Sequence, residues 1–468
     1  MKLWNQWYTC VRYFQPACSR NQTYIYLVLV LLGFTLRTDL AGVTSFIRAL
    51  WLYPLIYQRL LHFFCYSTAL NLDLLLYLWI QLVQKLFIPV TINGHVVYVA
   101  DGIKRAKEGL KMPCVKKLHQ SSENNSKAPY IMGHSLQAIS LLVKSPTGHA
   151  AAVPLAARIH EGVKYVPGST RSLLDKLAHL FVAIVPKGQS ALLIADAYYA
   201  SWKVIFPLLE QEHHLLTRVR TNAVAYLMPE KKTPGKKGRS KIYGTKVELN
   251  GYFKRMENFS KIPSPVYGEK DIAIDVCCMD LLWRPIAQFV RFVLVIHPTR
   301  GKIILMCTDL GLSAERIIEL YGYRFKIEVG FRQAIYQIGA YTYHFWLKIM
   351  DPIRRGSGDQ DLHDKSIFYQ KVFERKIEAY HRYIQLACIA QGLLIHFSLN
   401  YGQVVWQEYQ GWLRTMKKQN PPSEFVVAST LRSTLGDYLV NLPDNHEFKK
   451  IVNQNSRILK KPYLDIAA

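Results

Sequence analysis

The chain has 468 residues, 50% of them hydrophobic, which is enough to bury the cores of two or three domains. Lysine and arginine (59) outnumber aspartate and glutamate (33), and the formal net charge of +26 makes a polyanion the expected partner, nucleic acid first and an anionic membrane surface second. The eight cysteines lack a CxxC or any His/Cys spacing that suits zinc, so a zinc module of that kind is excluded and reduced thiols in a cytosolic protein are expected.

The N-terminal extension, residues 1–37, has an unknown role. Its apolar run at 23–36 is shorter than the roughly 20 residues that span a bilayer. We therefore expect this run to be a buried helix or strand. A peripheral membrane protein held by this run and by the basic surface remains a rival interpretation.

Residues 38–90 are expected to form a helical domain. Thr38 and Asp39 are candidate caps for one helix, and Asn71 and Asp73 for another. Such a domain could bind DNA or serve packing alone, because it carries no recognition-helix signature.

The next segment, 91–221, alternates strands and helices. Its expected strands are 95–101, 138–144, 149–158, 190–196 and 215–221, and its expected helices are 171–185 and 199–212. This alternation predicts a mixed α/β sheet with helices on both faces.

The alternation of strands and helices then stops. A β-rich insertion, 222–310, follows, and it contains a solvated basic run at 229–244. The core is expected to resume at 311–350 with a long helix capped by Ser313. Residues 351–468 are expected to be a C-terminal helical region.

Two aspartates end predicted strands. Asp101 and Asp196 sit where open α/β sheets place their sites, at the carboxyl ends of strands. Taken alone, Asp101 before Gly102 suits a turn, and Asp196 suits a helix cap. Asp309 also ends a strand and is a weaker rival, since its closeness to the next helix favours a turn.

The third acidic candidate is Glu328. At 100° per residue, Tyr321, Arg324, Glu328 and Arg332 share one stripe of a continuous helix. A surface ion-pair ladder is the simpler interpretation of this stripe. Three converging carboxylates would instead need divalent cations between them, and their oxygen ligands suit Mg²⁺ or Mn²⁺. Two such ions are suited to cutting and joining phosphodiesters.

The order strand-Asp101, strand-Asp196, helix-Glu328 resembles the catalytic triad of DDE transposases, which have a ribonuclease-H-like core. The run "YGYRFKIE", from Tyr321 to Glu328, resembles the tyrosine, arginine and glutamate signature of bacterial insertion-sequence transposases of the IS-four group, relatives of the Tn-five transposase. Residues 99–135 resemble the first-aspartate segment of one branch, and the resemblance covers roughly residues 40 to 400.

This resemblance implies that Asp101, Asp196 and Glu328 bind two Mg²⁺ or Mn²⁺ ions, while Tyr321 and Arg324 grip phosphates beside the cleavage site. The family has a lysine seven residues after the glutamate, where this chain has Ile335. Arg332 is the candidate substitute for that cation, although its reach differs.

Three further candidates have a weaker basis. Trp283 could stack on an unpaired base, but a core position is the simpler interpretation. His134 is placed near the active site by the resemblance alone. The lysines and arginines between 218 and 241 are expected to contact DNA phosphate without reading sequence.

The function we infer is that of a DNA transposase. The resemblance implies metal-dependent cleavage and strand transfer at the inverted-repeat ends of an insertion sequence by a cut-and-paste route through a hairpin. The expected partner is double-stranded DNA, both element ends and target, with no small-molecule substrate. A homodimer that pairs two ends and a cytoplasmic, nucleoid-associated location in a bacterium are also implied. The alternative is a catalytically inactive, transposase-derived DNA-binding protein.

Overall fold

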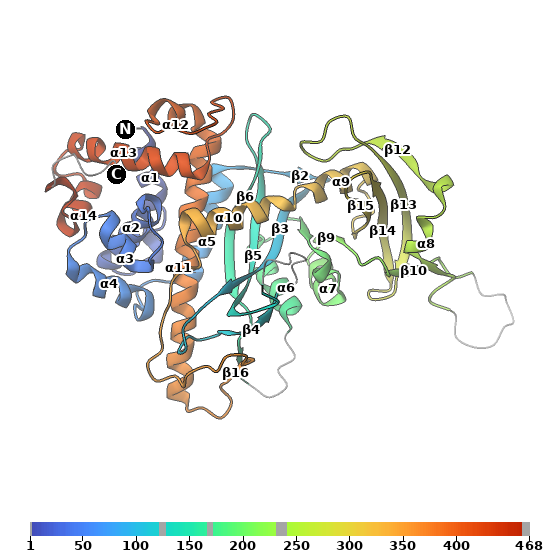
Figure 1. Ribbon diagram of the computed structural model, residues 1–468, viewed down its shortest axis with the longest axis horizontal. Helices are drawn as coiled ribbons and strands as arrows, with labels where there is room; N and C mark the ends of the chain where they lie inside the picture. Colours follow the sequence, from blue (N-terminus) through green and yellow to red (C-terminus); the bar gives the residue numbers. More distant parts are fainter. Residues whose placement is uncertain (1, 121–127, 166–171, 231–240, 461–468) are drawn as a thin grey trace. The chain divides into compact units, whose positions relative to one another are not determined.

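The computed structural model describes residues 2–120, 128–165, 172–230 and 241–460 (Figure 1). The chain divides into two compact units, each built from separate stretches of sequence. The first unit comprises Met1–Ile88, Gly102–Thr170 and Glu328–Ala468, and the second comprises Pro89–Asp101 and Arg171–Ile327. The predicted domain ranges follow chain order, and they stay predictions.

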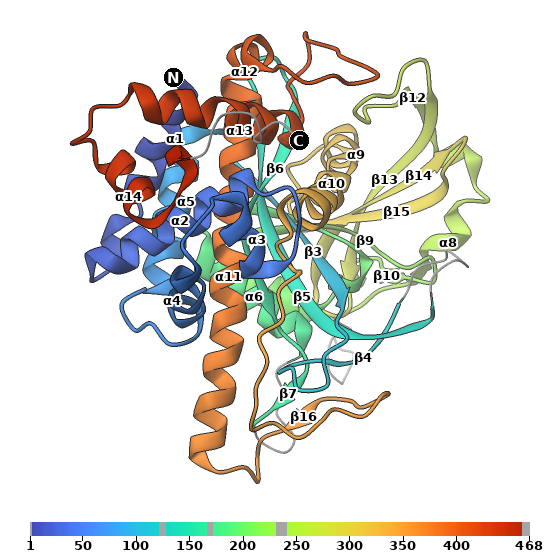
Figure 2. The same cartoon turned by 60° about the vertical axis from the view of Figure 1, so that its left-hand side comes forward.

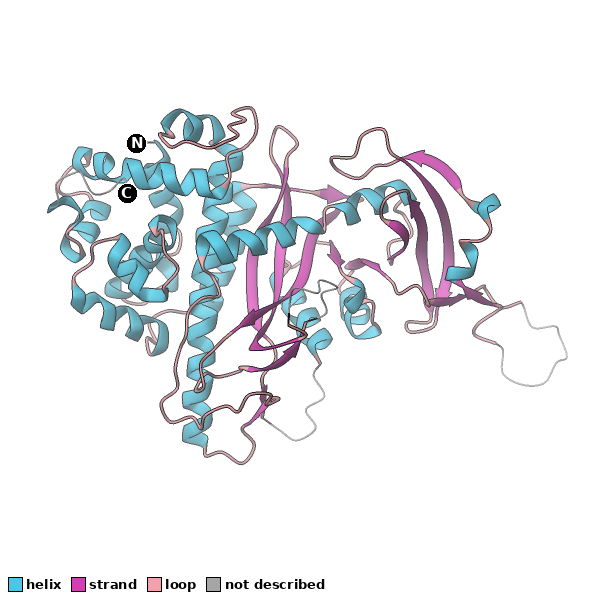
Figure 3. Ribbon diagram, in the orientation of Figure 1, coloured by secondary structure: helices cyan, strands magenta, loops and turns pink. Residues whose placement is uncertain are grey.

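Helices gather in the N-terminal part of the first unit (Figure 3). They are α1 (Lys2–Arg12), α2 (Asn21–Leu36), α3 (Gly42–Ala49), α4 (Pro54–Cys65) and α5 (Leu72–Leu86). The apolar run predicted to be buried is helix α2, and every residue from Leu27 to Leu36 is buried. No helix among the described residues is long and apolar enough to cross a membrane.

The predicted caps are half confirmed. Asn71 caps α5, since its side chain accepts a hydrogen bond from the backbone N–H of Leu74 at 3.0 Å. Neither Thr38 nor Asp39 caps α3, whose N-cap is Ala41. The Asp39 carboxylate instead accepts from the Ala41 N–H at 3.0 Å and from the Arg48 guanidinium at 2.7 Å.

The first unit also contains antiparallel strands covered by a long helix (Figure 2). Strands β5 (Tyr130–Lys144) and β6 (Ala150–Ile159) pair with each other, and β4 (Lys116–His119) pairs with β5. Helix α11 (Ile367–Asn400) packs on β6, where Gln385 donates to the Leu155 carbonyl at 2.8 Å. The remaining elements are β7 (Val163–Lys164), β16 (Gln360–Asp361), α12 (Gly402–Glu408), α13 (Glu424–Asn441) and α14 (Glu447–Asn455).

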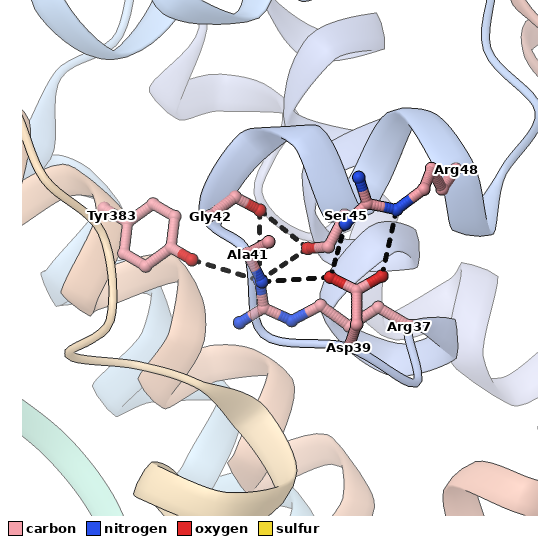
Figure 4. Close-up of polar contacts among 7 residues, drawn as sticks. All are labelled: Arg37, Asp39, Ala41, Gly42, Ser45, Arg48 and Tyr383. Carbon is pink, nitrogen blue, oxygen red and sulfur yellow. Dashed lines mark hydrogen bonds and ion pairs between the residues drawn. The ribbon is translucent and has the colours of Figure 1, made fainter.

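A buried arginine joins three segments of the first unit (Figure 4). Arg37 is 1% exposed and lies between the rings of Phe34 and Phe46, with its guanidinium carbon 4.7 and 4.9 Å from their centroids. Its guanidinium donates to Ser45 Oγ at 3.0 Å, Tyr383 Oη at 3.1 Å, Gly42 O at 3.3 Å and Ile338 O. The guanidinium is therefore held by aromatic faces and neutral acceptors, and its charge also acts on the nearby Asp39 carboxylate.

The second unit is a mixed sheet with covering helices. Strands β3 (His95–Ala106, of which His95–Asp101 belong to this unit), β8 (Ala191–Ala195) and β9 (His214–Arg218) pair in parallel, and β15 (Gly301–Cys307) is antiparallel to β9. An antiparallel run continues through β14 (Gln288–His297) and β13 (Ala273–Trp283) to β12 (Ser260–Pro263), β10 (Val224–Tyr226) and β11 (Lys246–Glu248). The other elements are β1 (Ile88–Pro89) at the unit boundary, β2 (Thr91–Ile92), α6 (Leu173–Ile184), α7 (Trp202–Leu209), α8 (Leu249–Tyr252) and α9 (Ala314–Gly322).

The predicted fold class is confirmed. Parallel and antiparallel pairing occur together with covering helices, a β-rich stretch follows β9, and helices dominate both ends of the chain. This arrangement is consistent with a ribonuclease-H-like core with an insertion.

Arg37 offers a direct test of the first unit. We expect Arg37→Ala to lower the free energy of unfolding by about 3 to 5 kcal/mol, because buried acceptors lose their donor and a cavity opens between two aromatic rings. Arg48→Ala is the matched control, since its pair with Asp39 is exposed and is worth about 0 to 1 kcal/mol. Urea unfolding followed by circular dichroism measures both, and equal losses would contradict the role given to Arg37.

Candidate active site

The two strand-end aspartates are brought to the same level of neighbouring strands. In the parallel pair β3–β8, Val99 lies opposite Ile194. Asp101 and Asp196 each lie two residues further along their strands, so side-chain alternation directs both to the same face of the sheet. Extending this register by two residues places Asp101, within β3, at the level of Asp196, directly after the end of β8.

Asp101 lies within β3, which continues to Ala106, so the simpler interpretation of this residue as a turn former is wrong. Its Oδ2 accepts a hydrogen bond from Arg324 Nη1 at 3.0 Å. The Arg324 and Asp101 side chains are only 22% and 16% exposed. This partial burial reduces solvent screening, so the ion pair fixes the guanidinium beside the carboxylate.

Asp196 ends β8 and begins a short 3₁₀ turn, Ala197–Tyr199. Its Oδ1 accepts from the Tyr198 N–H at 3.1 Å, so Asp196 caps this short turn, whereas the predicted helix that follows, α7, is capped by Ser201. The Asp196 backbone carbonyl accepts from Thr217 Oγ1 at 2.7 Å. The cap and the contact with β9 together hold this carboxylate at the strand end.

Tyr321 lies near the end of α9, and the charges of both aspartates affect the pKa of its hydroxyl. Burial raises the pKa of Tyr321, the positive charges of Arg324 and Arg218 oppose that rise, and the negative charges of Asp196 and Asp101 add to it. The phenol is therefore protonated at neutral pH and available as a hydrogen-bond donor.

Arg218 is a site residue that the sequence did not single out. It is the exposed last residue of β9, one position after Thr217, which pairs with Ala195 on β8. The sequence had grouped it with the basic stretch 218–241, of which 231–240 lie outside the described residues. Its place at a parallel strand end, one strand beyond Asp196, is the signal that could have separated it from that group.

A cavity of about 430 Å³ opens in the second unit beside these residues. Tyr321 and Arg324 line it together with His297, at the end of β14, and Arg300, in the turn between β14 and β15. Tyr267 also lines the cavity, and the Lys326 ammonium lies 4.7 Å from its ring centroid. The cavity lined by Tyr321 and Arg324 therefore also contains or adjoins other cations and aromatic rings.

The predicted continuous helix is wrong. Ser313 caps α9 as expected, accepting from the Arg316 N–H at 3.3 Å, but α9 ends at Gly322 and α10 begins at Phe325. Between them the N–H groups of Tyr323 and Arg324 bond three residues back, to the carbonyls of Leu320 and Tyr321. This tighter 3₁₀ turn changes the rotation per residue, so the stripe drawn at 100° does not extend across it.

Glu328 and Arg332 lie on α10 (Phe325–Gln333), and both are exposed. They belong to the first unit, so their approach to the two aspartates stays a prediction. Ile335 lies in the π-helical segment Ala334–Ile338 that follows α10. Among the described residues, no group of three or more His, Cys, Asp or Glu side chains is arranged to hold a metal ion.

The weaker candidates have structural roles. Asp309 Oδ1 accepts from the Gly311 N–H at 2.8 Å, as expected of a turn. Trp283 is 7% exposed at the end of β13, which favours the core interpretation over base stacking. His134 is buried in the first unit, where its Nε2–H donates to the Pro113 carbonyl at 2.8 Å and its ring packs edge-on against Tyr380. Its imidazole is enclosed within the first unit, and its placement near the active site, which rests on the resemblance alone, stays a prediction.

Comparison with known proteins gives one family match. Residues 148–342 match the family described as "Transposase DDE domain". This match supports a DDE transposase, and it covers Asp196, Tyr321, Arg324 and Glu328. No curated protein matches the chain.

One solved structure similar to this chain is described as a cryo-EM structure of the piggyBac transposase synaptic complex with hairpin DNA. The two share 10% sequence identity, with a TM-score of 0.36, over 94% of this chain and 77% of that chain. Similarity at this level does not by itself establish a shared fold.

The buried His134 predicts an acid-sensitive fold. Burial, followed by the nearby charge of Lys107, lowers the pKa of His134 to about 3, against about 6.5 in an unfolded chain. As pH falls below about 6.5, this imidazole is protonated in the unfolded state but stays neutral in the folded state. The free energy of unfolding therefore decreases as pH falls from about 6.5 to about 3. Between pH 7 and pH 4.5 this one group accounts for about 2 to 3 kcal/mol.

We expect His134→Leu to flatten this pH dependence, measured as the change in urea midpoint between pH 7 and pH 4.5. His179→Leu, which removes an exposed imidazole, is the control. A pH dependence in His134→Leu as steep as that of the unaltered chain would show that His134 does not cause it.

Proposed function

We propose that the protein is a DNA transposase that cuts and rejoins DNA at the inverted-repeat ends of an insertion sequence by a cut-and-paste route. The observation that carries this proposal is the shared register of Asp101 and Asp196, with the Arg324 guanidinium 3.0 Å from the first carboxylate. The match of residues 148–342 to a transposase DDE domain supports it independently. The IS-four group remains our assignment from the sequence signature.

The charge of the chain supports double-stranded DNA as the partner. A net charge of +26 attracts a polyanion, and Arg218 and Arg324 concentrate positive charge beside the paired carboxylates. Neither group reads bases in this arrangement, because phosphate contacts fix position without selecting sequence. We propose that a homodimer pairs two element ends, as in the resembling family.

The donor set fits a divalent cation. Asp101, within β3, and Asp196, directly after β8, carry carboxylate oxygens, the ligand type that Mg²⁺ and Mn²⁺ prefer. We propose that Glu328 is the third ligand and that two ions are held by these three residues. When bound, such ions lower the pKa of an attacking water or 3′-hydroxyl and offset charge on the leaving oxygen.

The chain's own residues then have separate tasks. Arg324 neutralises Asp101 before DNA binds, which offsets the repulsion between two nearby carboxylates. We propose that an incoming phosphate takes over this guanidinium, leaving Asp101 to its cation. Tyr321, protonated at neutral pH, donates a hydrogen bond to the same phosphate, and Arg218 binds the next phosphate along the strand.

Arg332 is proposed as the cation that replaces the family's lysine, since the Ile335 side chain carries no charge with which to bind a phosphate. The hairpin step depends on that replacement. The next experiment distinguishes a working enzyme from a catalytically inactive DNA-binding relative.

The test is Mg²⁺-dependent cleavage of linear DNA that carries the sequences flanking the gene. We expect Asp101→Asn, Asp196→Asn and Glu328→Gln each to reduce cleavage at least about 100-fold, because each loses charge where the reaction needs it. Asp280→Asn is the matched control, since this carboxylate pairs with Arg291 in the β-rich stretch. Cleavage should stop when EDTA removes the metal.

Full cleavage by any one of the three variants would remove that residue from the site. Absence of cleavage by the unaltered chain, with DNA binding retained, would favour the inactive relative.

A further inference from the structure

A second cavity, of about 610 Å³, lies within the first unit. It is lined by the stretch 106–110, which follows from β3, by residues of β4 and β5, and by residues 353–356. Its volume is within the range of pockets that hold small organic molecules or single nucleotides. Neither the expected catalytic residues nor the family resemblance accounts for it.

The lining combines an apolar floor with an exposed aromatic ring. Ile131, Met132 and Ile353 contribute apolar surface, and Leu110 and Tyr130 are 61% and 50% exposed. Exposed apolar side chains grouped around a hollow indicate a binding site, because isolated ones are common on any surface. A flat ring at the rim suits a flat ligand.

The charge of the lining is positive. The Lys117 ammonium lies 4.2 Å from the ring centroid of Tyr130, and Arg355 lines the cavity two residues before Ser357, whose carbonyl accepts from the Lys117 backbone N–H at 2.7 Å. Glu108 is the acidic residue among those that line the cavity. Lys107 is held inward, donating to the carbonyls of Tyr341 at 2.5 Å and Tyr343 at 2.9 Å. Lys117 and Arg355 are therefore the two cations of the lining that are suited to bind an anion.

We propose that this cavity binds one unpaired nucleotide of a DNA strand, with the base against Tyr130 and Leu110 and the phosphate between Lys117 and Arg355. The inference rests on the proposed function only in taking DNA as the source of that nucleotide. Aromatic stacking beside cations is how single-stranded nucleic acid is held without sequence preference. An acidic peptide would use the cations but not the stacking ring.

The test measures affinity for an oligothymidylate that carries one 2-aminopurine, whose fluorescence falls when the base stacks. We expect Tyr130→Ala to weaken binding at least about fivefold and to abolish the quenching, whereas Tyr130→Phe keeps both. Lys117→Ala should reduce the slope of log affinity against log salt by about 0.7, the value for one phosphate on a single strand.

Matched controls come from the same unit. Tyr77→Ala removes another exposed tyrosine, 57% exposed on α5, and Lys450→Ala removes an exposed lysine on α14. Equal affinities for Tyr130→Ala and Tyr77→Ala, with both proteins folded by circular dichroism, would overturn the proposal. Equal affinity for free deoxynucleoside monophosphate, or full competition by polyglutamate, would also overturn it.

The two proposals fail separately. In the Asp101→Asn variant, loss of cleavage with unchanged 2-aminopurine quenching is the expected result. If the unaltered chain quenches 2-aminopurine but does not cut DNA, only the proposed enzymatic function falls.

Discussion

The parallel pairing of β3 with β8 is the constraint on which the candidate site depends. Because Val99 lies opposite Ile194, two aspartates far apart in the sequence, each two residues further along the chain, lie at one level and on one face. A shift of either strand by a single residue would turn one carboxylate to the opposite face. Register, which is fixed by the buried residues Val97, Val99, Leu192 and Ile194, therefore determines whether a pair of carboxylates exists at all.

Two nearby carboxylates repel each other, and arginine side chains offset this repulsion. Arg324 bonds Asp101 directly, and the positive charges of Arg324 and Arg218 act on the same tyrosine hydroxyl as the two aspartates. The same guanidinium that neutralises a carboxylate in the free protein is suited to bind phosphate. In the function we propose, competition between these two partners lets an arriving DNA phosphate change the charge around Asp101.

Much of this arrangement was predictable from the sequence. Strand periodicity located β3, β8 and β9, and the position of an aspartate at the end of an apolar run identified Asp101 and Asp196. Short polar caps were also predictable, as Asn71 and Ser313 show. These features are local, since each depends on residues that are close in the sequence, within one strand or within one or two helical turns.

Other features depend on contacts that periodicity does not encode. The 3₁₀ turn at Tyr323 and Arg324 interrupts a sequence that reads as one helix, and the single Gly322 before it, at the end of α9, is a weak signal for a break. Arg218 resembled its basic neighbours until strand pairing placed it beside Asp196. His134 lies in a motif that resembles an active-site segment, yet packing encloses it. The relation of Glu328 to the aspartates is of the same long-range kind.

The most direct measurement is anomalous diffraction from crystals of the protein soaked in Mn²⁺. The account predicts a manganese peak bonded to carboxylate oxygens of both Asp101 and Asp196, with Arg324 displaced from Asp101, and no such peak in crystals of Asp196→Asn. Manganese bound elsewhere, with the bond between Arg324 and Asp101 intact, would contradict the claim that these strand ends form a metal-dependent active site.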